Sequence, residues 1–203
     1  MVVLDAAHGG EDRGGMLSEG QPEKAFTLAL SVRLRSLLGA RGIQVITTRE
    51  SDAAVDLNRR AEIANHANAN ACLSFHATET GSGIHLFVSS LAPVAPIRFA
   101  PWKTAQAAWV TRSIALAGEL NSALLHAGMN VTVGRTSLPA VDSMSCPAVA
   151  VEVAPETAQA STPGQPPNTQ LSDPAYQARV AEALAAALLE WRSDAGRTET
   201  RQP

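Results

Sequence analysis

Short apolar segments alternate with helical segments along most of this chain, and that alternation limits the folds it can adopt. Apolar, strand-like runs occur at residues 2–4, 43–47, 71–75, 83–89 and 148–153. Helical periodicity marks residues 22–38, 57–67, 104–127 and 173–191. Strands separated by helices usually pair in parallel, because a parallel pair needs a long crossover connection. The sequence therefore predicts an α/β three-layer sandwich, in which a mostly parallel sheet has helices on both faces.

Length and composition favour one domain with an aliphatic core. The chain has 203 residues, and only 4% of them are aromatic although 45% are hydrophobic, so Ala, Val and Leu must fill a single core. We expect the domain to span residues 1–192 and a polar, flexible tail to follow at 193–203. Residues 154–169 are rich in proline, serine and threonine, which is typical of a functional lid or a disordered loop.

Charge and hydropathy exclude several classes of partner. Sixteen Lys and Arg residues against 19 Asp and Glu residues give a net charge of -3, which offers no cationic face for nucleic acid. No run approaches the ~18 apolar residues that span a bilayer, and no secretion signal precedes the first strand. Cys72 and Cys146 each lie in an apolar run, and we expect them to be buried thiols rather than a disulfide. No residue pattern determines the oligomeric state, and a monomer is the expectation.

Polar side chains fall where the predicted strands end. His8 follows the first strand, His76 follows the third, Glu152 is near the end of a late strand, and Glu23 begins a helix. In open α/β sheets, ligands bind in the crevice outside the carboxyl ends of the strands. Two imidazoles and one carboxylate would leave a fourth position for water, which is the arrangement of catalytic zinc. The glycines around His8 would let its ring reach a metal.

Each of these residues also has an ordinary structural explanation. His8 could cap a backbone group in its loop, and Glu23 is an acid in the first turn of a helix, where the macrodipole favours it. Glu152 could pair with Arg135. His76 is the hardest to explain this way, because a buried imidazole would need its own hydrogen-bond partner. Spacing alone leaves these alternatives open, since no short ligand motif is present.

The order of several short motifs resembles the zinc-dependent N-acetylmuramoyl-L-alanine amidases. The matching segments are VLDAAHGG at 3–10, EK at 23–24, TR at 48–49, LNRRAEIAN at 57–65, SFHA at 74–77, VEV at 151–153 and LSD at 171–173. The resemblance covers residues 2–191. It implies that His8, Glu23 and His76 bind Zn²⁺ and that Glu152 is the catalytic acid and base. The substrate it implies is the amide between N-acetylmuramic acid and L-alanine in peptidoglycan, and the place of action is the cell envelope, periplasmic or extracellular.

Three segments differ from the family's usual sequence, and these differences keep other functions open. Ala6-Ala7 replaces Pro-Gly, Thr78 replaces Asn, and Ala154-Pro155 replaces Gly-Phe. The last of these motivates one alternative, a zinc-containing peptidoglycan-binding module that is weakly active or inactive. Another alternative is a zinc hydrolase acting on a different amide, because a fold does not determine its chemistry.

The remaining polar and aromatic candidates are expected to be structural. We expect an ion-pair network of Arg49, Arg60 and Asp52 around the second helix. His66, His85 and His126 are expected to be ordinary surface or helix residues. Trp102 and Trp109 are expected to pack in the core, although one of them could stack on a sugar, and Glu156 is a weaker competitor of Glu152.

Overall fold

The computed structural model describes residues 1–95, 101–157 and 169–199. Six strands form one sheet in the order β2-β1-β3-β6-β4-β5, parallel except where β4 meets β6. The strands are β1 (Val2–Ala6), β2 (Val45–Thr47), β3 (Ala71–Ala77), β4 (Ile84–Ser89), β5 (Val131–Thr136) and β6 (Ala148–Val153). The predicted lid or disordered loop at 154–169 lies largely outside the described residues.

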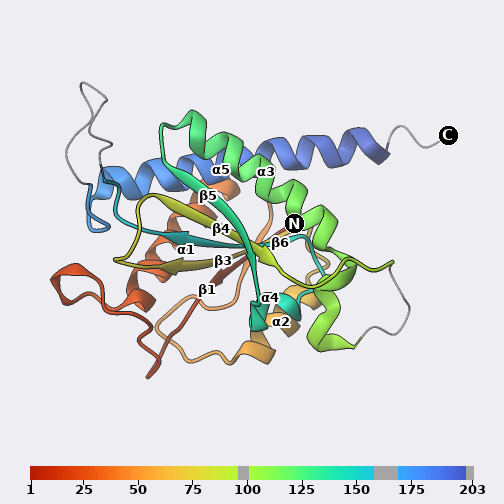
Figure 1. The fold of residues 1–203 in the computed structure, drawn as a ribbon, viewed down its shortest axis with the longest axis horizontal. Coiled ribbons are helices and arrows are strands. Elements are labelled where there is room, and N and C mark those ends of the chain that lie inside the picture. The colour runs from red at the N-terminus through yellow and green to blue at the C-terminus, as the bar shows by residue number, and fades with distance from the viewer. Residues whose placement is uncertain (96–100, 158–168, 200–203) are drawn as a thin grey trace.

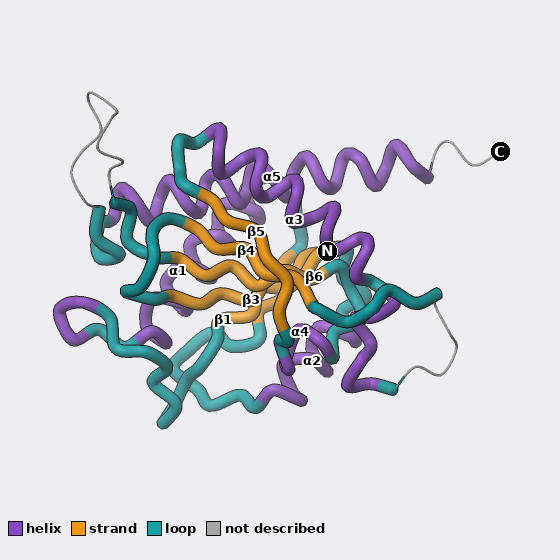
Figure 2. The backbone as a smooth tube through the Cα atoms, viewed as in Figure 1, coloured by secondary structure: helices purple, strands orange, loops and turns teal. Residues whose placement is uncertain are grey.

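Helices cover both faces of this sheet, as the alternation predicted. Figure 1 shows α3 and α5 above the sheet and α2 and α4 below it. The helices are α1 (Glu23–Ala40), α2 (Leu57–His66), α3 (Val110–His126), α4 (Pro139–Asp142) and α5 (Pro174–Glu199), with 3-10 turns η1 (Ser18–Gly20) and η2 (Trp102–Ala108). Figure 2 shows how strongly the strands twist, so that β5 crosses in front of its neighbours. The α/β three-layer sandwich is therefore confirmed.

Two aliphatic clusters of unequal size fill the space between the layers. The larger one joins α1, α3 and α5 to alternate strand residues such as Leu73 and Val151. The smaller one lies on the other face, where Ala61 and Ala64 of α2 meet Cys72 and Ala148. Because side chains alternate along a strand, Ser74 and His76 share the face of Cys72. His76, the predicted ligand on β3, thus lies on the face of the sheet that has the smaller cluster.

Several boundaries differ from the sequence-based expectations. The predicted helix over 104–127 is divided at Trp109 into η2 and α3, and Thr104 has non-helical backbone angles. The helix α5 continues to Glu199, beyond the expected end at Trp191. The sequence analysis missed β5 and α4 altogether. No helix of the described residues has an apolar stretch long enough to cross a membrane.

The prediction of two free thiols was wrong, because Cys72 and Cys146 form a disulfide with a Cα–Cα distance of 6.3 Å. The two cysteines are 74 residues apart in the chain, so their spacing gave no hint of contact. They meet because β3 and β6 are parallel neighbours, with Cys72 opposite Ala148, two residues beyond Cys146. The bond therefore joins the beginnings of the two strands that carry His76 and Glu152.

Candidate metal centre

The three residues predicted as ligands lie together at the carboxyl ends of β1 and β3. His8 Nε2 lies 3.2 Å from Glu23 Oε2, and His76 Nδ1 lies 3.1 Å from Glu23 Oε1. One ligand atom from each residue falls within 4.8 Å of the others. Two ligands bound at ~2.0–2.1 Å to a tetrahedral zinc lie about 3.3 Å apart. The donor set and its spacing therefore fit zinc, with the fourth position left open.

Local structure explains how residues so distant in sequence meet. His8 follows the end of β1 by two residues, and His76 is the second-last residue of the neighbouring parallel strand β3. Glu23 is the first residue of α1, with the extended Pro22 as its N-cap. His8 has a φ of 63°, in the left-handed region, and the glycines at 9 and 10 continue the turn. Such a backbone conformation costs about 1–3 kcal/mol in a non-glycine residue, so surrounding contacts must hold it.

Glu23 is ionised at neutral pH in this environment. Burial raises its pKa, but a hydrogen bond with His76, backbone hydrogen bonds from Gly15 and Ala77, and the charge of His8 together lower that pKa to about 2. The carboxylate oxygens accept the two backbone N–H groups at 2.8 and 3.1 Å. Metal binding requires deprotonated ligands, and Glu23 is therefore in the form that a metal needs.

Asp12 orients the ring of His8. Its Oδ2 lies 2.9 Å from His8 Nδ1, and its Oδ1 accepts a hydrogen bond from the backbone of Gly14. An imidazole that binds a metal through one nitrogen usually donates a hydrogen bond from its other ring nitrogen to a carboxylate or carbonyl, which fixes the orientation of the ring. Gly14, with a φ of 65°, passes so close that an added Cβ would lie 2.6 Å from both Glu23 Oε2 and His8 Cδ2. The sequence analysis missed Asp12, although it stands only four residues after His8.

Two buried arginines donate hydrogen bonds to the backbone that leads to His8. Arg49 donates to the carbonyl oxygens of Ala6 at 2.9 Å and Ala7 at 3.0 Å. Arg60 donates to the carbonyl oxygens of Ala6 and His8, both at 2.6 Å. Every carbonyl between the end of β1 and His8 therefore accepts from a guanidinium group. We call Arg49 and Arg60 the arginine clamp.

Asp5 anchors the clamp from inside β1. Its carboxylate, 1% exposed, accepts hydrogen bonds from Arg60, Thr48 and Ser74, each at 2.7 Å. The network predicted around the second helix thus exists, but its acid is Asp5, which the sequence analysis missed. Asp52 instead pairs with Lys24 at 2.6 Å near the surface.

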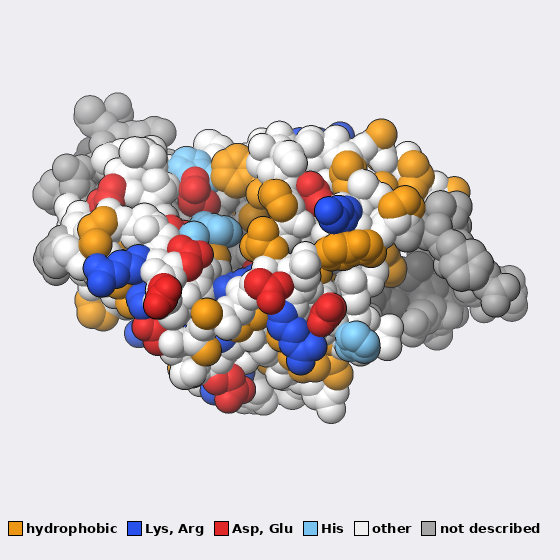
Figure 3. Space-filling view, turned by 90° about the horizontal axis from the view of Figure 1, so that it is seen from below, with side chains coloured by type: hydrophobic (Ala, Val, Ile, Leu, Met, Phe, Trp, Pro, Cys, Tyr) orange, Lys and Arg blue, Asp and Glu red, His pale blue; other side chains and the backbone are white. Residues whose placement is uncertain are grey.

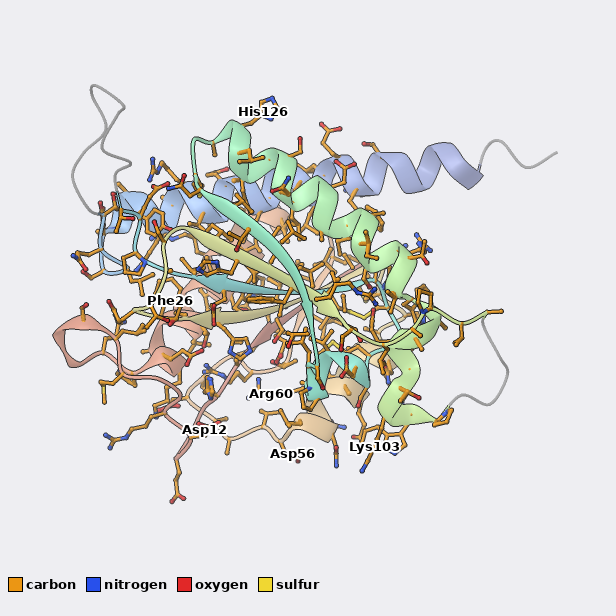
Figure 4. The ribbon with its side chains drawn as sticks, in the orientation of Figure 1. Asp12, Phe26, Asp56, Arg60, Lys103 and His126 are labelled. Carbon is orange, nitrogen blue, oxygen red and sulfur yellow. A yellow bond between two sulfur atoms is a disulfide. The ribbon has the colours of Figure 1, made fainter. Side chains whose placement is uncertain are left out.

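Two of the three predicted ligands, His8 and His76, line a cavity of about 590 Å³. Ser74 and Ala140 also contribute to its lining. The charged residues of the lining are Asp5, Glu11, Asp12, Asp56 and Arg60. Asp12 and Asp56 lie along the same side of the molecule as Arg60 (Figure 4). Figure 3 looks onto the hollowed face, where histidine and acidic side chains gather together.

Glu152 lies beside the ligand set but is not part of it. It is the register partner of His76 on the neighbouring strand and is half-buried. The suggested structural partner, Arg135, instead donates to the carbonyl oxygens of Ser89 and Leu91. Among the described residues, the Glu152 carboxylate has no hydrogen-bond or ion-pair partner, and it is not among the residues that line the cavity.

The competing residues have structural contacts. Glu156 is 5% exposed and pairs with Arg179 at 2.9 Å. His66 and His126 bond to carbonyl oxygens within their own helices, and His126 lies at the top of the molecule (Figure 4).

Trp102 and Trp109 do not line the cavity beside His8. Trp109 lies near Arg112, whereas Trp102 is 47% exposed, against the expectation that it packs in the core. His85 differs from His66 and His126, because it lies on the sheet opposite Glu152.

Comparison with known proteins matches nearly the whole chain to one family. A family profile described as N-acetylmuramoyl-L-alanine amidase matches residues 2–190. The amidase AmiA of Escherichia coli is 40% identical over 77 residues, which are 38% of this chain and 27% of that protein. The amidase Rv3717 of Mycobacterium tuberculosis is 30% identical over 145 residues, which are 69% of this chain and 58% of that protein. The matched segments thus span less than two thirds of these relatives.

Solved structures share the fold over nearly the whole chain. The catalytic domain of CwlV, an amidase of Bacillus (Paenibacillus) polymyxa var. colistinus, is similar with a TM-score of 0.71 at 24% identity, covering 95% of this chain and 97% of that one. The amidase Ami1 of Mycobacterium smegmatis is similar with a TM-score of 0.71 at 22% identity, covering 95% and 96%. At these identities the likeness concerns the fold.

Proposed function

This chain belongs to the N-acetylmuramoyl-L-alanine amidase family, and we propose that it is a zinc-dependent hydrolase that cleaves the amide between N-acetylmuramic acid and L-alanine in peptidoglycan. The observation that carries the proposal is the convergence of His8, Glu23 and His76, whose ligand atoms lie within 4.8 Å of one another beside the cavity that His8 and His76 line. The substrate is inferred from the family membership, and the metal is inferred from the donor set.

The proposed roles follow from the positions of the side chains. His8 Nε2, Glu23 and His76 Nδ1 would hold the zinc, and Asp12 would orient His8. When bound, zinc would supply Lewis-acid chemistry that polarises the scissile carbonyl and lowers the pKa of water. A carboxylate oxygen of Glu152 takes a proton from the attacking water and returns it to the nitrogen of the departing L-alanine. Hydrolysis then leaves a lactyl carboxylate on the sugar and a free amine on the peptide.

The disulfide supports an envelope location for this activity. Disulfides persist in the periplasm and outside the cell, whereas cytosolic thiols are kept reduced. The bond between Cys72 and Cys146 therefore fits the compartment where peptidoglycan lies. We propose action in the cell envelope.

A second candidate is a zinc-containing module that binds peptidoglycan with little or no turnover. One observation favours it: Glu152 is not among the residues that line the main cavity, and Ala154-Pro155 directly follow its strand. In such a module the metal ligands and the cavity would remain, but no group would transfer the proton.

The products of a muramyl-tripeptide digest test the proposal. The wild-type protein should release free N-acetylmuramic acid and a tripeptide with a new N-terminal L-alanine, both identified by mass spectrometry. Glu152→Gln, which keeps the side chain's shape, should lower kcat by at least the ~100-fold typical of a lost acid or base. Glu182→Gln, which changes an exposed carboxylate, serves as the matched control and should retain activity. Equal activity of Glu152→Gln and the wild type would remove Glu152 from the mechanism, and binding without cleavage by the wild type would favour the module.

A further inference from the structure

One row of side chains crosses four strands on the face of the sheet that carries the metal site. His76 pairs in register with Glu152, Glu152 with His85, and His85 with Thr132. Directly opposed side chains lie ~4.5–5.5 Å apart at their Cβ atoms. His85 is therefore the neighbour of Glu152 on the side away from the metal ligands. The proposed catalytic acid lies between the metal site and the outward surface of β4 and β5.

That surface is open because the helices on this face stop short of it. The smaller core cluster, which α2 and α4 complete, ends at Phe87, whose side chain is only partly buried against it. Beyond Phe87 the face continues over His85, Thr132 and Gly134, which are half-buried or exposed. In Figures 1 and 2, no described helix is drawn in front of β4 and β5. We call the surface formed by these four residues the β4–β5 shelf.

The shelf presents two flat rings and two polar groups. The rings of His85 and Phe87 are 6.5 Å apart and inclined by 32°. Gly134 lies against Phe87, where an added Cβ would be 3.4 Å from the ring, so the strand leaves the ring surface uncovered. His85 Nδ1 bonds with Thr132 Oγ1 at 2.6 Å. Among the described residues His85 Nε2 has no hydrogen-bond partner, although the backbone of Gly81 passes beside it, where an added Cβ would be 2.7 Å from this nitrogen.

Charge distinguishes the shelf from the cavity. The cavity is lined by the exposed carboxylates of Glu11, Asp12 and Asp56 and by the buried Asp5–Arg60 ion pair, whereas none of the four shelf residues has a carboxylate. Exposed carboxylates suit a group with a free amine. A neutral shelf of aromatic rings beside hydroxyl and imidazole groups suits a neutral ring that has apolar faces and hydroxyl edges, because rings stack there while polar side chains reach the edges.

We propose that the β4–β5 shelf binds the sugar ring of N-acetylmuramic acid, with His85 Nε2 hydrogen-bonding to a polar group of the sugar and the Phe87 ring contacting its apolar face. This inference rests on the proposed amidase function and adds the site that recognises the glycan side of the substrate. The peptide would then extend toward the exposed carboxylates of the cavity. His85, expected from sequence to be an ordinary residue, becomes a specificity-determining one.

Two substrates separate recognition of the sugar from chemistry at the amide. Muramyl-tripeptide contains the sugar, whereas D-lactoyl-tripeptide keeps the same scissile amide and peptide without it. His85→Asn and Phe87→Leu should each lower kcat/KM for the muramyl substrate roughly five- to tenfold, the size of one lost hydrogen bond or ring contact, and leave kcat/KM for the lactoyl substrate unchanged. Gly134→Val, which removes no group but places a side chain over Phe87, should act in the same direction.

Matched controls exclude a general loss of structure. Val133 lies on β5 between Thr132 and Gly134, is 54% exposed, and faces the other way, so Val133→Ala should change neither substrate. Equal losses on both substrates, or no loss on either, would overturn the sugar shelf while leaving the amidase function intact.

Failure of the amidase proposal gives a different pattern. If the wild-type protein cleaves neither substrate, binding of muramyl-tripeptide and of D-lactoyl-tripeptide is measured by calorimetry on the wild type and on His85→Asn. Weaker binding of the muramyl ligand alone would support the shelf in a non-catalytic module. Unchanged binding, or no binding to the wild type, would overturn it.

Discussion

Replacing Arg60 with methionine should weaken both the fold and the metal site. Arg60 is 3% exposed and forms an ion pair at 2.7 Å with Asp5, which is 1% exposed. Methionine keeps much of the side chain's length but removes every donor, so Asp5 stays buried with only Thr48 and Ser74 as partners. Breaking a buried pair in this way costs about 3–5 kcal/mol. A protein of ordinary stability, about 5–15 kcal/mol, would still fold in most of that range.

The same change also releases the carbonyl of His8. This carbonyl accepts a hydrogen bond from Arg60 at 2.6 Å, in a residue whose φ is 63°. Loss of a contact that orients a ligand typically lowers metal affinity about 10- to 100-fold. We therefore expect weaker zinc binding even under conditions where Arg60→Met is fully folded, as measured by competition with a chromophoric chelator.

A double-mutant cycle distinguishes the ion pair from a general packing defect. Urea unfolding gives the free energy of unfolding for the wild type, Arg60→Met, Asp5→Asn and the double variant. Because Asp5→Asn removes the stranded charge, the double variant should be less destabilised than the sum of the single variants by ~1–3 kcal/mol. The reasoning is refuted if the free energy of unfolding of Arg60→Met lies within about 1 kcal/mol of the wild-type value and the variant binds zinc equally well.

Other predictions concern the remaining supports of the site. Gly14→Ala should lower zinc affinity more than stability, because its Cβ would contact Glu23 and His8; chelator competition and urea unfolding measure the two effects. Reduction of the Cys72–Cys146 bond, which closes a 74-residue separation, should lower the free energy of unfolding by ~4 kcal/mol, and a double Cys→Ala variant should not respond to reductant. In metal-free protein, Glu23 should contribute stability that is present above its ordinary pKa of 4.5 and lost as the pH falls toward its folded pKa of about 2. Glu23→Gln should remove that component of acid unfolding, and an unaltered pH profile would contradict the low pKa.

The sequence predicted most of the sheet because buried strands leave local patterns, whereas the ligand set came from the resemblance to a family. Apolar runs at 71–75 and 148–153 have the length and composition of buried strands, and the structure places strands over both. The strand β5 was missed because VTVGRT contains a glycine and mostly exposed side chains, as suits an edge strand. Edge strands bury little, so their pattern is weak.

Contacts between residues far apart in the chain could not be predicted from the sequence, for a different reason. The disulfide and the row through His85 depend on strand order and register. The arginine clamp depends on how α2 and the residues after β2 pack against the end of β1. Arg60 and Asp5 are separated by 55 residues, and nothing in either segment indicates the other. Nothing in the sequence linked His85 with Glu152. The two residues meet because β4 and β6 pair antiparallel in a mostly parallel sheet.

A zinc titration of amide cleavage tests the central claim most directly. Protein stripped with a chelator and then dialysed is given zinc in steps, and release of the tripeptide from muramyl-tripeptide is followed at each step. Our account predicts no cleavage without zinc, a linear rise, and a plateau at one zinc per chain, with His76→Ala inactive at that zinc level. Full cleavage by the stripped protein, or none at any zinc level, would contradict it.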